Sequence, residues 1–313
     1  GDPFRHWDED TIVSSRCTRC HNTNGFSEYA MGDATTDQLP LSTVGCTTCH
    51  NQFNLYSNPE TRYDAAGENP AIQDVEFPSG ATATLGNASN ICMGCHQGRS
   101  SGVQVANATP NDTIQNPDYP SFNFINIHYY AAAATFFGSD VNGGYEYEGQ
   151  QYRGRNGFGV HSQLGAAQVL VDCVGCHLNA DPAEPEKHTF LPKVADCNAC
   201  HAGGAFETLR GSPSDNFEDI ETLKDELLAA IQAYAISGNP VNSPIVYSSN
   251  YPYWVTPSGA PYRDADFTML TAMYNYHLAQ EDPAGYIHNG AYIIELLYDS
   301  IVAVGGTPSV PRL

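Results

Sequence analysis

Positively charged residues are scarce in this 313-residue chain. It has 13 Lys and Arg against 35 Asp and Glu, which gives a formal net charge of −22 at pH 7. This balance argues against nucleic acid as a partner, because binding to a phosphate backbone requires a basic surface. Long apolar runs are also missing, so no segment reaches the roughly 20 residues that a membrane-spanning helix needs. With 41% hydrophobic residues, the chain still has enough apolar side chains to form a core.

Cysteines outside a motif are absent, because all ten fall into five C-x-x-C-H motifs: CTRCH, CTTCH, CMGCH, CVGCH and CNACH. This motif is typical of c-type haem attachment, in which two cysteines form thioethers with the porphyrin and the adjacent histidine binds iron. Disulfides or zinc knuckles also use C-x-x-C pairs, but neither explains a histidine after every second cysteine. The sequence therefore predicts five haem c groups and their iron. The predicted covalent sites are Cys17, Cys20, Cys46, Cys49, Cys92, Cys95, Cys173, Cys176, Cys197 and Cys200, and the predicted proximal iron ligands are His21, His50, His96, His177 and His201.

The predicted haems indicate where the protein matures. Haem is attached to cysteine outside the cytoplasm, so we expect an exported protein, extracellular or on the outer cell surface, with the periplasm as the alternative. A basic, apolar leader is missing from the first residues, and Gly1 is interpreted as the product of leader cleavage.

The spacing of the motifs predicts a mostly irregular, loop-rich multihaem cytochrome c with short helices. Residues 1–206 are expected to carry all five haems, with close motif pairs at 17–50 and 173–201 and a single motif at 92–96. Residues 207–313 lack attachment motifs and are expected to form a helical segment that packs on the haem core as one cooperative unit. Little β structure is expected beyond a short hairpin near 142–153, where glycines and alternating tyrosines occur.

Three helices are predicted in the C-terminal segment. The first spans 215–238 and begins with capping-box spacing. The second spans 266–280 and is ended by Pro283, and the third follows an Asn289 cap and continues to residue 305. Each carries apolar residues at helical periodicity.

The sixth coordination position of each iron decides whether it can bind substrate, because a second strong ligand closes it. Five irons need five such distal ligands. Six histidines lie outside the motifs: His6, His128, His161, His188, His277 and His288. The four methionines are weaker candidates, because Met93 lies inside a motif and two others occupy core-like helical positions.

The six histidines differ in how they could reach an iron. His161 and His188 lie near attachment motifs, so little loop-closure entropy opposes ligation. His128 and His288 require tertiary contact. His277 ranks last, because a core histidine is the competing interpretation on its helix. The resulting prediction is bis-histidine ligation of all five irons.

Four segments carry a further signal: "HWDEDTIVSSRCTRCH", "NICMGCHQGRSSG", "IHYYAAAATFFG…GGYEYEGQQYRG" and "MLTAMYNYHLAQEDPAGYIHNGAYIIELLYDSI". They resemble segments of the multihaem c-type cytochromes of metal-respiring microbes, some of which polymerise into extracellular filaments. The resemblance implies electron transfer rather than catalysis, with haems in alternating slip-stacked and T-shaped pairs. It also supports five distal ligands: His6, His128, His161, His188 and His288.

The resulting hypothesis is an electron carrier of anaerobic respiration rather than an enzyme, and a subunit of a head-to-tail filament. His6 is then able to ligate a haem across the subunit interface, and redox proteins or extracellular metal oxides would be the electron-transfer partners. One alternative is a multihaem oxidoreductase, such as a nitrite or hydroxylamine converting enzyme, with one open haem. Another is a storage or structural haem protein.

Overall fold

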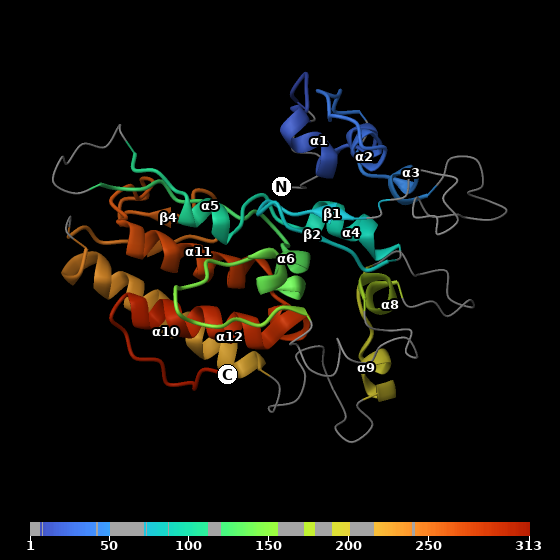
Figure 1. Cartoon of the computed structure of the whole chain (residues 1–313). Helices are drawn as coiled ribbons and strands as arrows, with labels where there is room; N and C mark the ends of the chain where they lie inside the picture. The colour runs from blue at the N-terminus through green and yellow to red at the C-terminus, as the bar shows by residue number, and fades with distance from the viewer. Residues whose placement is uncertain are drawn as a thin grey trace. The chain divides into compact units, whose positions relative to one another are not determined.

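The computed structural model of the chain describes residue 7 and residues 9–41, 43–50, 72, 74–86, 88–111, 120–155, 172–178, 190–200, 216–239 and 242–313. Its described part is loop-rich, with short helices first, longer helices near the C-terminus and two small antiparallel sheets (Figure 1). This confirms the fold class expected from the sequence. None of its described helices is long and apolar enough to cross a membrane.

The chain divides into two compact units. Unit 1 comprises residues 1–76, 82–96 and 172–190, and unit 2 comprises residues 77–81, 97–171 and 191–313. The domain boundary predicted at residue 206 lies outside the described residues.

Unit 1 consists, in its described part, of short helices and one two-stranded sheet. These elements are α1 (Ser15–His21), α2 (Thr23–Ala30), α3 (Cys46–Cys49), β1 (Val75–Glu76), β2 (Thr82–Ala83), α4 (Ser89–His96) and α8 (Cys173–His177). In the sheet, Val75 pairs with Ala83 and Glu76 with Thr82. The buried apolar side chains described in unit 1 are Val13, Phe26, Ala30, Ile72, Val75, Ile91 and Met93. So small a set gives little stabilisation by apolar burial.

Close packing fixes α2 against α1, which carries the first attachment motif. The side-chain oxygen of Asn22 accepts hydrogen bonds from the backbone N–H groups of Asn24 (2.9 Å) and Gly25 (3.2 Å) and so caps α2. A Cβ atom on Gly25 would lie 2.3 Å from the Cβ of Thr18. Only glycine permits this approach, so the contact sets the position of the motif.

Unit 2 contains the longer helices. Its elements are α5 (Gly102–Ala106), α6 (Ala132–Phe137), the 3₁₀ helix η1 (Ser139–Val141), α9 (Val194–Cys200), α10 (Phe217–Ser237), β3 (Val246–Tyr247), β4 (Trp254–Val255), α11 (Phe267–Glu281) and α12 (Gly285–Ala303). Helices α10, α11 and α12 pack against one another (Figure 1). Their buried side chains form one apolar core together with Val105, Phe122, Ile127 and Trp254.

The first two C-terminal helices confirm their sequence predictions. Helix α10 ends at Ser237 with Gly238 as its C-cap, and the start predicted at Asp215 lies outside the described residues. Helix α11 begins after Asp266, whose side chain accepts a hydrogen bond from the N–H of Met269 at 2.8 Å. It ends at Glu281, two residues before Pro283.

The third helix is interrupted where the sequence predicts its cap. Helix α12 contains a break at Asn289, whose φ of −165° and ψ of 73° are not helical. The side-chain oxygen of Asn289 accepts from the N–H of Tyr292 (3.2 Å), as an N-cap does. A single turn, containing His288, therefore precedes the main helix.

The hairpin predicted near 142–153 is wrong. Only an isolated antiparallel bridge, between Gly138 and Gly154, adjoins this segment, which contains no strand. Side chains of the helices satisfy its backbone instead: the Asn275 amide accepts from the N–H of Tyr145 (2.7 Å) and donates to its carbonyl (2.9 Å). The alternating tyrosines therefore reflect packing on helices rather than strand pairing.

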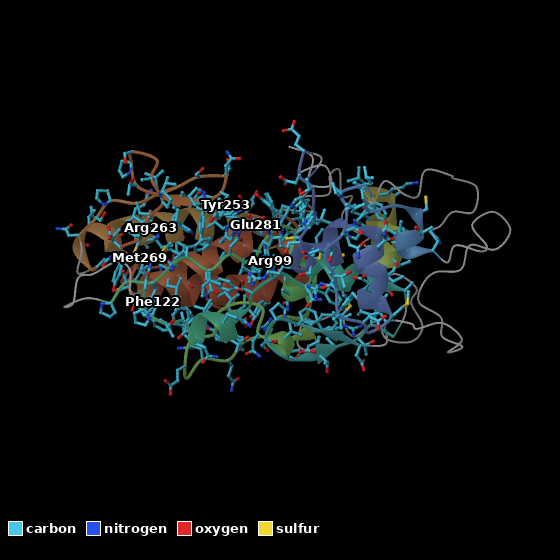
Figure 2. All side chains as sticks on the ribbon, turned by 90° about the horizontal axis from the view of Figure 1, so that it is seen from above. Arg99, Phe122, Tyr253, Arg263, Met269 and Glu281 are labelled. Carbon is cyan, nitrogen blue, oxygen red and sulfur yellow. The ribbon has the colours of Figure 1, made fainter. Side chains whose placement is uncertain are left out.

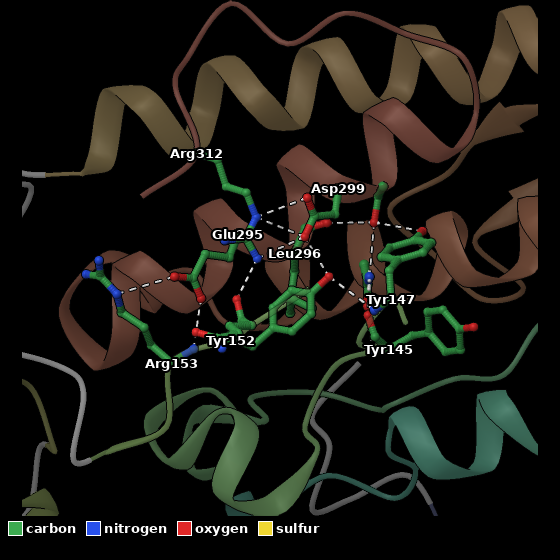
Figure 3. Close-up of polar contacts among 11 residues, drawn as sticks. Tyr145, Tyr147, Tyr152, Arg153, Glu295, Leu296, Asp299 and Arg312 are labelled. Atoms are coloured by element: carbon green, nitrogen blue, oxygen red, sulfur yellow. Dashed lines mark hydrogen bonds and ion pairs between the residues drawn. The ribbon is translucent and has the colours of Figure 1, made fainter. Parts of the chain in front are cut away.

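Buried carboxylates hold this segment on α12 (Figure 3). The Asp299 carboxylate accepts from the Tyr152 hydroxyl at 2.6 Å and from Nε of Arg312 at 3.1 Å. Glu295 accepts from the backbone N–H of Arg153 at 2.8 Å and pairs with its guanidinium at 3.3 Å. Burial raises the pKa of Glu295 despite the nearby arginines. The network ties the 142–155 segment and the C-terminal residues to the same helix.

Candidate haem-binding region

Both cysteines of each attachment motif lie on a short helix. Motif residues form the last turn of α1, α4 and α9 and make up all of α3 and α8. In a helix, residues i and i+3 share a face with residue i+4. In α1, α4 and α8, which include the motif histidine, the two cysteines and the histidine can therefore approach one edge and one face of the same porphyrin, which fits c-type haem. His50 follows α3 in an extended conformation.

Glycine inside one motif allows α4 to pack tightly on α2. A Cβ atom on Gly94 would lie 3.0 Å from the Tyr29 ring and 3.2 Å from the Phe26 ring. These two rings also contact each other, with centroids 5.9 Å apart. The motif of α4 is thus seated on an aromatic surface of α2.

Thiols from motifs distant in sequence lie together in unit 1. Cys92 of α4 is hydrogen-bonded to Cys173 of α8, and Cys95 of α4 is hydrogen-bonded to Cys20 of α1. Before haem attachment, these hydrogen bonds, followed by burial, raise the pKa of the Cys92 and Cys95 thiols well above the usual value. Cys49 of α3 is near enough to both to raise each pKa further. The α4 motif is therefore the meeting point of four attachment motifs.

Two predicted proximal histidines, His21 and His177, make defined contacts with neighbouring residues. The His21 ring contacts the Trp7 ring, with centroids 4.9 Å apart. The His177 Nδ1 atom lies 2.7 Å from the backbone carbonyl of Phe190, to which it can only donate. Metal-binding histidines commonly donate their second ring N–H in this way, which leaves Nε2 to bind the metal. The geometry at His177 thus fits an axial haem ligand.

Several predicted ligands lie outside the described residues: His6, His161, His188 and His201. The side chain of Cys200 also lies outside the described part. Within the described residues, no three His, Cys, Asp or Glu side chains are arranged to hold a metal ion directly.

His288 is held by a buried carboxylate. Its Nδ1 atom lies 2.9 Å and 2.8 Å from the two oxygens of Asp282. Burial would raise the pKa of Asp282, but the charge and hydrogen bond of a protonated His288, with the N–H of Ala284, together lower it below its usual value. In His288, as in His177, the Nδ1 atom is therefore hydrogen-bonded to an oxygen.

His128 lies on a turn with unusual backbone geometry. Its φ is +75°, and that of Tyr130 is +51°, a region that non-glycine residues seldom adopt. The side-chain oxygen of Asn126 accepts from the N–H of His128 at 2.7 Å and stabilises this turn. Such conformations persist where the surrounding structure enforces them, often at functional sites.

His277 is a fully buried residue of α11 with both ring nitrogens engaged. Its Nε2–H donates to Asn126 Oδ1 at 2.9 Å, and its Nδ1 accepts from the Tyr247 hydroxyl at 3.2 Å. Burial, with a smaller effect of His128, lowers its pKa to about 3. His277 is therefore neutral near pH 7, and its 3.5 Å contact with Glu281 is not an ion pair at that pH. These contacts favour the core-histidine interpretation.

Glu281, beside Tyr253 in unit 2 (Figure 2), is expected to make stability depend on pH. Burial raises its pKa from 4.5 to about 7. Its neutral form is therefore favoured on folding, so its contribution is complete below pH 4.5 and is lost as pH rises to 7. Because solvent screens part of this effect, we expect Glu281→Gln to stabilise the protein at pH 8 by about 2 kcal/mol and to change little at pH 4.5.

The check is chemical denaturation of both proteins at the two pH values, followed by helix circular dichroism. The exposed Glu148 provides a matched control, because Glu148→Gln removes the same charge without burial. An equal effect of the two variants would contradict the assignment.

The sequence alone does not identify Asn126, which binds His128 and His277, or Asp282, which binds His288. The only local feature that marks Asp282 is its position between the end of a helix and Pro283. Nothing in the pattern around Asn126 connects it with a histidine 151 residues later.

Comparisons with known proteins also point to c-type cytochromes. A model of the family "Cytochrome c554 and c-prime" matches residues 5–51, which contain the first two motifs. "C-type polyheme cytochrome OmcB" of Geobacter sulfurreducens is 26% identical over 360 residues, covering 95% of this chain and 45% of the relative. "C-type polyheme cytochrome OmcC" of the same species is 28% identical over 353 residues, covering 95% and 43%. No solved structure matches at a significant level.

The chain spans less than half the length of these curated relatives. The matched part includes nearly all of this chain and so extends through both of its units.

Proposed function

We propose that this chain, a homologue of polyhaem c-type cytochromes, transfers electrons through five covalently attached haems whose irons all carry two histidines. The convergence of four attachment motifs around α4 supports the proposal most strongly. Bound haem supplies one-electron exchange between ferric and ferrous iron. Because tunnelling falls steeply with distance, haems held close together by these motifs would pass electrons without any acid, base or nucleophile from the protein.

In this proposal each haem is held by two cysteines and two histidines. The ten motif cysteines hold the porphyrins, and the five motif histidines are the proximal ligands. The proposed distal ligands are His6, His128, His161, His188 and His288. His277 is left as a core residue, which the engagement of both its ring nitrogens supports.

Removal of one distal ligand should open one iron. We expect His288→Ala to convert one fifth of the haem from low-spin to high-spin and to let that fraction bind carbon monoxide after reduction. The measurements are absorption and EPR spectra of the purified protein, together with its mass, which should equal the chain plus five haems. Unchanged spectra would exclude His288 as a ligand.

A matched control comes from the neighbouring helix. In His277→Gln, the side-chain amide can still donate to Asn126, so the spectra are expected to match those of the unmodified protein. High-spin iron in the unmodified protein, with turnover of nitrite or hydroxylamine, would instead favour the open-haem enzyme.

For its setting, we propose an exported, extracellular subunit of a head-to-tail filament. A contact between unlike surfaces that does not close on itself generates a helical polymer. Redox proteins or extracellular metal oxides would accept the electrons. The deep negative charge favours cationic partner surfaces.

His6 is proposed to complete a haem of the adjacent subunit. We expect His6→Ala to abolish filaments in negative-stain micrographs and to alter one haem spectrum per subunit, because ligation and assembly share the same residue. Intact filaments with unchanged spectra would contradict both roles. Dispersed particles from the unmodified protein would remove the filament proposal and leave electron transfer untouched.

A further inference from the structure

We infer that Asp282 is a positioning residue for His288, which it holds in the tautomer and orientation that present Nε2 to haem iron. In doing so it lowers the reduction potential of that haem. The inference rests on the proposed function, in which His288 is a distal ligand.

The hydrogen-bond geometry fixes the tautomer. Both Asp282 oxygens lie within 2.9 Å of His288 Nδ1, and the carboxylate side chain is 2% exposed. A carboxylate only accepts, so Nδ1 carries the proton. In a neutral imidazole the lone pair then resides on Nε2, which is the atom that binds iron.

Asp282 is itself held in place by the connection between α11 and α12. Its N–H donates to the carbonyl of Leu278 (3.2 Å), and its carbonyl accepts from the N–H of Gly285 (2.9 Å). The N–H of Ala284 donates to its carboxylate (3.3 Å). Turning the carboxylate away would therefore break its hydrogen bonds with the N–H of Ala284 and with His288.

The histidine is fixed from its own side of the pair. The backbone N–H of His288 donates to the carbonyl of Ala284 (3.0 Å) within the single turn that opens α12. The break at Asn289 follows immediately, so this turn is separate from the main helix. With backbone and Nδ1 both fixed, the ring has one defined orientation.

The carboxylate also affects the electronic properties of the ring. Partial transfer of the Nδ1 proton toward Asp282 makes the imidazole a stronger donor. A stronger axial donor stabilises ferric over ferrous iron, because the ferric ion has the greater positive charge. The haem bound by His288 should therefore have a lower potential than it would with a neutral partner.

The test is Asp282→Asn, which keeps the shape and an oxygen acceptor but removes the charge. In a spectroelectrochemical titration of the full protein, we expect one fifth of the haem amplitude to move to higher potential while four fifths remain unchanged. Asp282→Glu should restore the lower potential. Asp266→Asn is the matched control, since Asp266 caps the other end of α11 and binds Met269 and Tyr234.

A second measurement needs no variant of Asp282. In EPR of the unmodified protein, the low-spin signal lost in His288→Ala should have the smallest g spread, because a stronger donor increases the splitting of the iron d orbitals. A large g spread for that signal, or unchanged potentials in Asp282→Asn, would overturn the role of Asp282. If His288→Ala leaves every signal intact, the proposed ligation itself fails, and the two failures are thus distinguishable.

Discussion

In cells that cannot attach haem, the full chain is expected to lose the structure of unit 1 and to retain helices α10, α11 and α12 of unit 2. The two units differ in what stabilises them. Unit 2 buries a continuous set of apolar side chains from these helices, including Leu223, Leu270 and Leu297. Each fully buried leucine contributes about 2 kcal/mol, so many of them can offset the entropy of ordering the chain.

Unit 1 lacks that source of stability in its described part. Its helices are 4 to 8 residues long, and isolated helices of this length are unstable in water. Few of its apolar side chains are buried. The proposed covalent haem would supply the missing apolar surface and join both cysteines of a motif to one rigid group, so its absence should leave the backbone without enough contacts to stay ordered.

Hydrogen exchange followed by mass spectrometry can compare the proteins with and without haem. Peptides from α1, α2 and α4 should exchange at once without haem, whereas those from α10 to α12 should stay protected. Persistent protection of the unit 1 peptides without haem would contradict the expectation.

A graded version removes one haem at a time. The double substitution of Cys92 and Cys95 by serine should perturb α1 and α8 as well as α4, because Cys95 lies beside Cys20 and Cys92 lies beside Cys173. The matched control replaces Cys46 and Cys49, of which Cys46 is exposed. Its effect should be smaller and confined to α3 and its neighbours.

The sequence predicts those features that depend on local pattern. The helices at 217–237 and 267–281 follow from apolar periodicity and from the Asp266 cap, and the break at Asn289 follows from the same capping chemistry. The attachment motifs are readable because their spacing is fixed by the porphyrin.

What the sequence does not predict depends on contacts between distant residues. Tyr145 and Tyr147 alternate as in a strand, yet Asn275 and the buried acids of α12 bind this segment instead. The fixation of His128 and His277 by one Asn126 amide is similarly invisible in either local pattern. Such pairings depend on how helices pack, and one sequence contains little information about that.

Among single substitutions in unit 2, Asp299→Ala is expected to be one of the most destabilising, at about 3 kcal/mol. The Asp299 side chain is 8% exposed and accepts from both Tyr152 and Arg312. Its truncation would remove the acceptor from a tyrosine hydroxyl and leave a partly buried guanidinium without its closest carboxylate. The 142–155 segment and the C-terminal residues would then lose their shared attachment to α12 (Figure 3).

The isosteric variant separates charge from contact. Asp299→Asn keeps an oxygen that accepts from the Tyr152 hydroxyl but removes the pairing with Arg312, so its loss should be smaller than that of Asp299→Ala. In urea denaturation followed by helix circular dichroism, the Ala variant should have the lower midpoint, and Tyr152→Phe should cost much less in the Ala background than in the unmodified protein. Additive losses from Asp299→Ala and Tyr152→Phe would show that the hydroxyl does not depend on this carboxylate, and the network would then stabilise the helix through Arg312 alone.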